Sequence, residues 1–300
     1  MKVVACCHLY PPGSRVGSWL STHEYLAELV RRGHQVDVIR LRAGVRSDYR
    51  HEGVTVHAGP GWRDRLIPTA DVVVAHCGDG GALDQATAPT VRFVHMPCPD
   101  KDLTADLVIW NSETSRLPIP GRSIVLHPPV HPDRYRTAPG DHVTLVNLSK
   151  AKGVKTLHRV AQRMPDVRFL GVRGGYGGQH APKLPNLEAV RTVTDMRAVY
   201  RRTRILIAPS SYESWGRVGV EAMASGIPVV AHPTPGLVES LGDAGIFVDR
   251  DDVDGWVEQI RRLQDPTEWS AASRLATARS AELDPGDDLD RFVEEIEALC

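Results

Sequence analysis

Short runs of β-branched and other apolar residues alternate along the chain with stretches in which apolar residues recur every three or four positions. Residues 2–7 predict a buried strand, and residues 19–32 predict a helix because Trp19, Leu26 and Leu29 share one face. Such alternation is typical of βαβ units, whose parallel sheet is buried on both faces. Further strands are predicted in the first half at residues 36–41, 54–57, 72–76, 91–95 and 107–109.

A proline-rich stretch at residues 126–139 interrupts the rhythm and is typical of a linker between domains. The alternation then restarts, so we expect two domains at residues 1–138 and 139–283. A last helix within residues 284–300 is expected to cross back to the first domain. In the second half, strands are predicted at residues 143–148, 167–172, 205–208, 228–231 and 246–248, and helices at 154–164, 196–201, 218–225, 238–241 and 253–263.

The composition changes this picture little. The 300 residues are 42% hydrophobic and 24% charged, which excludes a disordered, collagen-like or coiled-coil chain. A net charge of -1 indicates no general attraction to nucleic acid or anionic lipid. No apolar run is long enough to span a membrane, and no signal peptide is expected. The cysteines follow no zinc spacing and favour a reducing, cytoplasmic location: Cys6, Cys7, Cys77, Cys98 and Cys300.

The residues with the clearest chemistry lie between 205 and 230. An apolar strand runs into a Ser/Gly loop that opens a helix near Gly216, and such a turn directs backbone N–H groups toward an anion. Arg217 adds a positive charge suited to phosphate. Glu221 lies one turn further among apolar residues, where a carboxylate needs hydrogen-bond donors. Ribose hydroxyls would supply them; the alternative is a carboxylate that complements the helix dipole or caps a loop.

Glu213 and Glu221, separated by seven residues and followed by Ala-Met-Ala-Ser-Gly-Ile-Pro, resemble the signature of retaining GT-B glycosyltransferases of family 4, also called group 1. The resemblance implies an α/β protein of two Rossmann-like, doubly wound parallel-sheet domains facing a cleft. It is weaker in the N-terminal half. Other blocks that resemble the family are Gly33-His34-Gln35-Val36, Lys152-Gly153, Thr194-Asp195-Met196 with Tyr200, and Asp243-Ala244-Gly245.

The resemblance implies a donor site for a nucleotide-diphosphate sugar, UDP- or GDP-linked. Glu221 would bind the ribose, and Lys152 would neutralise the diphosphate, whose charge develops as it departs. Glu213 would face the donor sugar and the pyrophosphate, together with the amides of Trp215, Gly216, Arg217 and Val218.

One departure concerns the phosphate site. The family usually has an arginine five residues before the lysine, where this chain has Asn147. Arg217 or Arg173 would then have to replace that cation. The glycine-rich residues 171–178 and Val193 are expected to line the nucleotide pocket.

In the first half, Gly17 stands where the family has a glycine that approaches the donor phosphate, although a plain helix entry explains it equally well. His95, at the end of a predicted strand, matches a family histidine near the reaction centre, and His76 ends the preceding strand in the same way. Retaining members transfer the sugar on one face while the leaving phosphate helps to deprotonate the acceptor. We therefore expect Glu213, His95 and Lys152 to act in catalysis and name no nucleophile.

No metal and no cofactor besides the donor substrate are expected. Asp249-Arg250-Asp251 resembles a metal motif of another glycosyltransferase fold, but its place before residues 253–263 predicts a loop and helix cap. His127 and His131 are four apart, yet the prolines between them prevent a helix that would align them.

The acceptor is an unidentified hydroxyl, on a glycan, a lipid-linked sugar or another molecule. Peripheral membrane contact stays open. A hydroxylated base in DNA is an outside option, supported only by the 10 basic and 6 acidic residues within residues 1–65. The alternatives to a transferase are a nucleotide-sugar epimerase or hydrolase, a phosphorylase, and a nucleotide-sugar-binding protein with weakened catalysis. Neither the donor base nor the oligomeric state can be deduced from the sequence.

Overall fold

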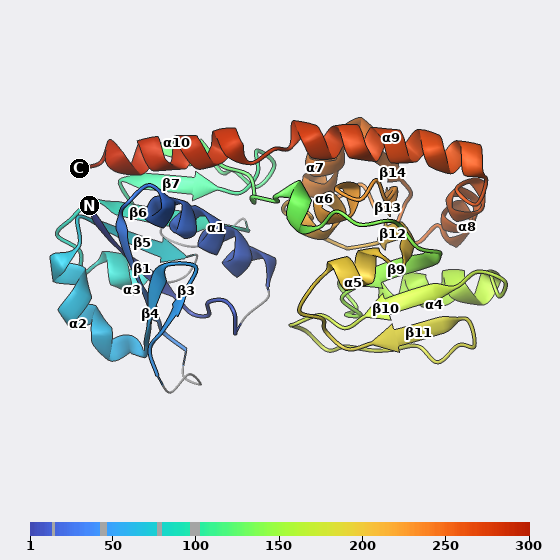
Figure 1. The fold of residues 1–300 in the computed structure, drawn as a ribbon, viewed down its shortest axis with the longest axis horizontal. Coiled ribbons are helices and arrows are strands. Elements are labelled where there is room, and N and C mark those ends of the chain that lie inside the picture. Colours follow the sequence, from blue (N-terminus) through green and yellow to red (C-terminus); the bar gives the residue numbers. More distant parts are fainter. Residues whose placement is uncertain (14–15, 43–46, 77–79, 97–102) are drawn as a thin grey trace. The chain divides into compact units, whose positions relative to one another are not determined.

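The computed structural model describes residues 1–13, 16–42, 47–76, 80–96 and 103–300. The chain folds into two compact units, Met1–Pro129 with Pro285–Cys300, and Val130–Asp284 (Figure 1). The first boundary therefore lies before Val130, whereas the proline-rich stretch had suggested a boundary after residue 138. Val130 is buried against Trp215 and Val220 of the second unit, which explains the difference.

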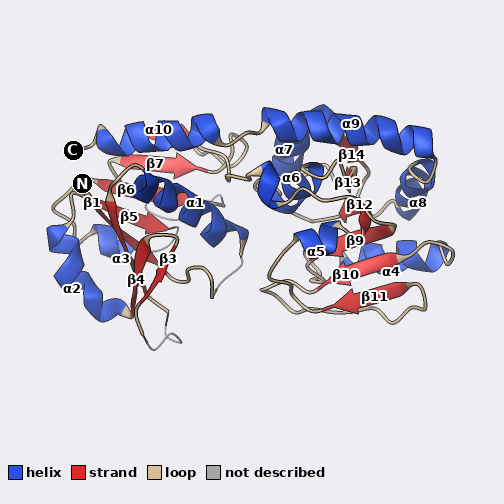
Figure 2. Ribbon diagram, in the orientation of Figure 1, coloured by secondary structure: helices blue, strands red, loops and turns tan. Residues whose placement is uncertain are grey.

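The first unit is built on a parallel sheet with the strand order β3-β4-β2-β1-β5-β6-β7-β8 among the described residues (Figure 2). Of the strands that the described residues form, only the short β3 runs antiparallel, paired with β4 in a hairpin. The strands are β1 (Lys2–Cys7), β2 (Gln35–Arg40), β3 (Tyr49–His51), β4 (Val54–Ala58), β5 (Val72–His76), β6 (Thr90–Val94), β7 (Leu107–Trp110) and β8 (Ser123–Val125).

The first unit includes the last helix of the chain. Phe292 of α10 packs against Tyr25 and Phe93, with ring centroids 4.9 and 5.7 Å apart, and Asp288 accepts a hydrogen bond from the backbone N–H of His127 at 2.8 Å. This helix therefore completes the apolar core on one face of the sheet. The helices of this unit are α1 (Gly17–Arg31), α2 (Arg63–Leu66), α3 (Gly80–Leu83) and α10 (Gly286–Glu297).

The second unit has a parallel sheet with the order β11-β10-β9-β12-β13-β14 (Figure 2). Its strands are nearly all apolar, as expected for a sheet buried on both faces. The strands are β9 (His142–Val146), β10 (Phe169–Val172), β11 (Leu187–Val190), β12 (Thr203–Ala208), β13 (Val229–Ala231) and β14 (Gly245–Phe247). The helices are α4 (Val154–Arg163), α5 (Arg197–Tyr200), α6 (Arg217–Met223), α7 (Pro235–Leu241), α8 (Val253–Arg262) and α9 (Pro266–Glu282).

The prediction of two Rossmann-like α/β units is confirmed, and one long helix was missed. α9 was missed because its sequence shows no apolar stripe; Ala276 and Ser280 are its only buried residues. Asp265 caps it by accepting from the N–H groups of Thr267 and Glu268. Cys6 and Cys7 are buried thiols of β1, Cys300 is exposed, and Cys77 and Cys98 lie outside the described residues. In the described part of the chain, no helix has the length and apolar character that crossing a bilayer requires.

Candidate functional site

The candidate site of the second unit lies at the carboxyl ends of β9 and β12, which are neighbours in the parallel sheet. The loops that follow these strands, residues 147–153 and 209–216, touch each other. The N–H of Ser211 donates to the carbonyl of Ala151 at 2.8 Å. Gly153 has a φ of 89°, and a Cβ there would lie 2.4 Å from the Pro209 carbonyl oxygen. Glycine therefore allows the two loops to meet.

Lys152 and Glu213 form an ion pair where these loops meet. Lys152 Nζ lies 2.5 Å from Glu213 Oε1, and the Ser210 hydroxyl donates to the same oxygen at 2.8 Å. Burial lowers the pKa of Lys152, but Glu213 and Tyr176 raise it by more. The pKa of Lys152 therefore lies above its ordinary value. The site thus holds a permanent, partly buried cation at the edge where an anion binds in such folds.

Glu221 is buried in α6 and bound by two side chains. Arg217 Nε donates to Oε1 at 2.8 Å, and the Tyr200 hydroxyl donates to Oε2 at 2.8 Å. Burial, and after it the charge of Glu221, raises the pKa of Tyr200 well above its ordinary value, so the phenol stays neutral. Arg217 Nη2 also donates to the Tyr135 hydroxyl at 2.9 Å. Neither these donors to Glu221 nor the burial of Arg217 was predicted from the sequence.

The turn into α6 presents main chain rather than side chains. Trp215 is 3% exposed and its indole packs against Val130 and Val220. Gly216 has a φ of 84°, and a Cβ there would lie 2.4 Å from a methyl of Leu237. Val218 is half-buried in the first turn of α6. The indole of Trp215 is therefore part of the apolar core and does not line the site.

Asn147 is occupied with holding the adjacent glycine-rich loop. Its φ is 74°, in the left-handed region that asparagine tolerates better than most residues. Its Oδ1 accepts from Gln179 Nε2 at 2.8 Å, and Gln179 Oε1 accepts from the N–H of Gly174 at 2.8 Å. Gln179 was not predicted as a residue of the site, because no motif includes it.

Arg173 is exposed and follows β10 directly, beside the end of β9. The N–H of Asn147 donates to the carbonyl of Val172, the residue before Arg173, at 2.8 Å. The backbone of Arg173 therefore lies close to that of Asn147. Val193 is half-buried against the apolar cluster of Leu170 and Val172.

Arg250 is a second residue of the site that was not predicted from the sequence. Its Nε donates to the Pro209 carbonyl at 2.8 Å and its Nη2 to the Lys150 carbonyl at 2.5 Å. Arg250 thereby links the two loops of the site, residues 147–153 and 209–216. Asp252, one residue beyond the Asp-Arg-Asp triplet, caps α8 through the N–H of Gly255, so the triplet lies in a loop, as predicted, and the cap is its neighbour.

In the first unit, His76 and His95 lie together at the carboxyl ends of β5 and β6. Their rings stack with centroids 4.7 Å apart, and the ring of Trp19 stacks on His76 at 3.7 Å. His95 Nε2 lies 3.2 Å from the Thr22 hydroxyl. Burial lowers the pKa of His95 to about 4, and burial together with His95 lowers that of His76 well below its usual range. Both imidazoles are therefore neutral near pH 7.

Gly17 is the first residue of α1. Its carbonyl accepts from the Ser21 hydroxyl at 2.8 Å, an ordinary bond of a first helical turn. Thr22 of the same helix contacts His95, so α1 connects Gly17 with the histidine pair.

Solved structures with the same fold cover 99% of this chain. Sucrose-phosphate synthase from Thermosynechococcus elongatus matches with a TM-score of 0.78 at 15% identity over 98% of its own chain. HepE from Anabaena, in complex with UDP-glucose, matches with a TM-score of 0.78 at 19% identity over its whole chain. The fold is thus that of the GT-B proteins. The family model described as "Glycosyl transferases group 1" matches residues 143–265, all of which lie in the second unit.

Curated relatives agree with this family. A D-inositol 3-phosphate glycosyltransferase from Mycobacterium sp. (strain KMS) is 30% identical over 263 residues, covering 72% of this chain and 58% of the relative. The corresponding protein from Mycolicibacterium smegmatis is 28% identical over 279 residues, covering 78% of this chain and 63% of the relative. The chain thus spans less than two thirds of the length of these relatives.

Proposed function

We propose that the protein transfers a sugar from a nucleotide-diphosphate sugar to a hydroxyl acceptor with retention of anomeric configuration. The observation that carries the proposal is the Lys152–Glu213 pair at the ends of β9 and β12, within the segment that the family model matches. A diphosphate placed beside Lys152 gains a cation that is already ordered and charged, and stabilising a departing anion is the main task in such a reaction.

In this proposal, the donor occupies the second unit. Lys152 contacts the diphosphate, and Glu213 orients Lys152 and faces the donor sugar. The main-chain N–H groups of residues 215–218 contact the pyrophosphate. Glu221 still has unused lone pairs beside Arg217 and Tyr200, because a carboxylate accepts about four hydrogen bonds, so it can also bind ribose hydroxyls. Arg173 supplies the charge that Asn147 lacks, and Val193 contacts the base.

The reaction needs no side-chain nucleophile. The bond between the sugar C1 and the phosphate oxygen breaks, a bond from C1 to the acceptor oxygen forms on the same face, and the acceptor proton passes to the leaving phosphate. In this proposal, the neutral His95 would donate or accept a hydrogen bond with an uncharged sugar hydroxyl, and Gly17 would approach the phosphate. No metal takes part in this proposal. We place the enzyme in the cytoplasm, since Cys6 and Cys7 are buried thiols rather than parts of a disulfide framework.

The experiment that tests this function is product analysis with radiolabelled UDP- and GDP-sugars. D-inositol 3-phosphate is the first acceptor, because the curated relatives are named for it, and glycan, lipid-linked and hydroxymethylated DNA acceptors follow. The proposal is supported if the label appears in the acceptor product and an α-specific glycosidase then releases the labelled sugar from it, since an α-linked donor has then given an α-linked product. Free sugar alone, an epimerised donor, or tight binding without turnover identifies a hydrolase, an epimerase or a binding protein instead.

A further inference from the structure

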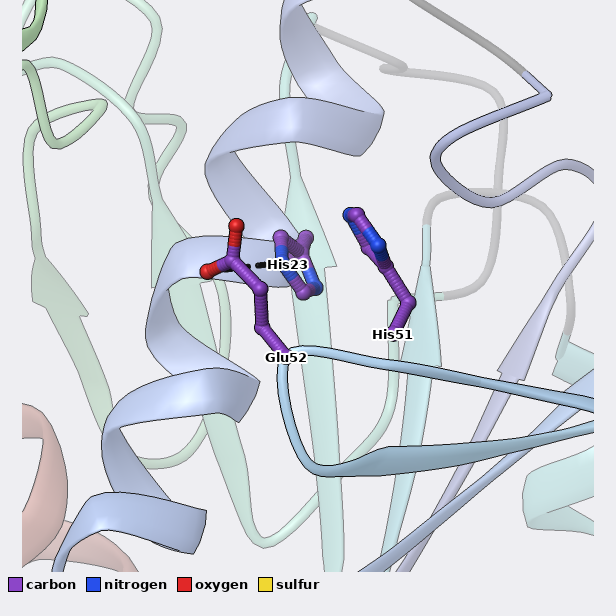
Figure 3. A group of neighbouring side chains, drawn as sticks. All are labelled: His23, His51 and Glu52. Carbon is purple, nitrogen blue, oxygen red and sulfur yellow. Dashed lines mark ion pairs between the residues drawn. The ribbon is translucent and has the colours of Figure 1, made fainter.

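Three side chains with metal-binding atoms meet in the first unit, and none of them is among the residues assigned above. His23 comes from α1, whereas His51 ends β3 and Glu52 follows it in the turn to β4 (Figure 3). One ligand atom from each lies within 4.8 Å of the other two. The 28 positions that separate His23 from His51 hide this cluster from any motif search.

The hairpin turn is held against α1 independently of these three residues. Gly53 has a φ of 84°, and a Cβ there would lie 2.6 Å from a methyl of Val30, so the turn fits closely onto the helix. The Tyr49 hydroxyl donates to the Pro11 carbonyl at 2.8 Å. The positions of His51 and Glu52 beside His23 therefore follow from the backbone.

His23 is arranged as a metal-binding histidine is. It is 2% exposed, and its Nδ1 lies 2.8 Å from the hydroxyl of Tyr10. In the tautomer that leaves Nε2 without a proton, Nδ1–H donates a hydrogen bond to the phenol oxygen. The lone pair of Nε2 then points away from Tyr10, and ligating histidines commonly donate their second N–H in this way.

The groups around His23 Nε2 favour the binding of a cation. Nε2 makes no hydrogen bond within the described chain, and Glu52 Oε2 lies 3.5 Å from it, at ion-pair distance. The ring of His51 stacks on that of His23 with centroids 4.5 Å apart. A lone pair and a carboxylate oxygen therefore face each other across a gap.

We propose that His23, His51 and Glu52 bind one divalent transition-metal ion, with Zn²⁺ as the ion to test. Two imidazoles and one carboxylate form a recognised zinc ligand set, and a water molecule would complete the tetrahedron. Ligands at about 2.1 Å from zinc lie roughly 3.4 Å apart, close to the present 3.5 Å between Nε2 and Oε2. His51 and Glu52, less buried than His23, can rotate to close the remaining distance.

Bound there, the ion would tie the β3–β4 hairpin to α1, the helix that begins at Gly17 and carries Thr22 beside His95. The ion would therefore stabilise the fold of the first unit and would take no part in the proposed sugar transfer. Its test uses metal binding and not turnover, so it stands or fails separately from the glycosyltransferase proposal.

The experiment is calorimetric titration of the chelator-treated, full-length protein with Zn²⁺ at pH 7.5, in parallel with Co²⁺ absorption spectroscopy. We expect one ion per chain and visible bands typical of tetrahedral Co²⁺. His51→Ala and Glu52→Gln should each weaken Zn²⁺ binding by more than about 100-fold, beyond the loss that a partner of a ligand causes. Tyr10→Phe, which removes the partner of Nδ1, should weaken it by about 10- to 100-fold.

His158→Ala is the matched control, since it removes a histidine of α4 in the other unit and should leave binding unchanged. An excess of Mg²⁺ should not compete, because imidazole favours zinc over magnesium. The proposal is overturned if no saturable Zn²⁺ binding occurs, or if His51→Ala and Glu52→Gln, both with the circular dichroism of the folded protein, bind Zn²⁺ as tightly as the wild type.

Discussion

Arg217 and Glu221 form a buried ion pair one turn apart in α6, with Nε and Oε1 separated by 2.8 Å and side chains that are 9% and 5% exposed. The residue assigned to the donor ribose and a residue proposed to meet the phosphate are thus bound to each other. The carboxylate is held in place before any ligand arrives. Its loss therefore has a structural effect as well as a functional one.

Glu221→Ala should destabilise the protein as well as weaken donor binding. The change leaves the buried guanidinium of Arg217 without its carboxylate, and breaking a buried pair costs about 3–5 kcal/mol of unfolding free energy. Glu221→Gln keeps an acceptor oxygen for Arg217 and should cost less. Urea unfolding measures both. Glu258→Ala on the exposed side of α8 is the control, and equal stability of Glu221→Ala and the wild type would contradict the buried pair.

Lys152→Met should weaken the binding of UDP or GDP, whichever base the protein accepts. A charge-assisted contact to phosphate is worth about 1.5–3 kcal/mol, which corresponds to roughly a 10- to 100-fold higher dissociation constant. Calorimetry with each nucleotide measures it. Lys155→Met, three residues on and exposed, should bind as the wild type does. Unchanged affinity in Lys152→Met would remove Lys152 from the diphosphate site.

Arg173→Ala tests whether an exposed arginine replaces the cation that Asn147 cannot supply. We expect an affinity for nucleoside diphosphate lower by about tenfold, with less effect on the nucleoside monophosphate, because the second phosphate carries the charge that is recognised. The exposed Arg159 of α4 provides the control variant, Arg159→Ala. If both nucleotides lose affinity equally, Arg173 does not contact the terminal phosphate.

The buried histidines of the first unit predict a loss of stability on mild acidification. A pKa of about 4 for His95 means that the unfolded chain takes up a proton near pH 6.5 and the folded chain does not. The free energy of unfolding should therefore fall as the pH drops below 6.5, by roughly 2 kcal/mol at pH 5 from His95 alone.

Urea titrations at pH 7 and pH 5 measure this fall. His95→Gln should show a smaller difference between the two pH values than the wild type, whereas His158→Gln should keep the full difference. Carboxylates with lowered pKa values, such as Asp166 at about 2, lose their stabilising effect only at lower pH and do not disturb the comparison. A stability that does not change between pH 7 and 5 would mean that His95 takes up a proton in the folded state.

Strong periodicity made most of the fold predictable. α4 and α8 carry apolar stripes and were predicted close to their observed bounds, whereas α9 carries small and charged residues on all sides. Its start was nevertheless marked by Asp265 and Pro266, a typical cap followed by a proline in the first turn. A prediction based on caps as well as on stripes would have found this helix.

The site was less predictable because motifs identify residues and not their partners. The spacing of Arg217 and Glu221 is that of a helical ion pair, so their contact was available from the sequence. The hydrogen bond from Tyr200 to Glu221 and those from Arg250 to the two loops join positions far apart in the chain. No local pattern indicates such contacts, and the same holds for His23 with His51.

The assignment of α10 to the first unit has a consequence for synthesis. Residues Val130–Asp284 form one continuous segment that contains a whole sheet and its helices. The first unit, although it begins the chain, lacks Phe292 against Tyr25 and Phe93 until the ribosome has made that entire segment. Domains usually mature in the order of translation. Here the order is reversed: the unit that emerges first is the last to close its core, and until then it presents an apolar face to chaperones.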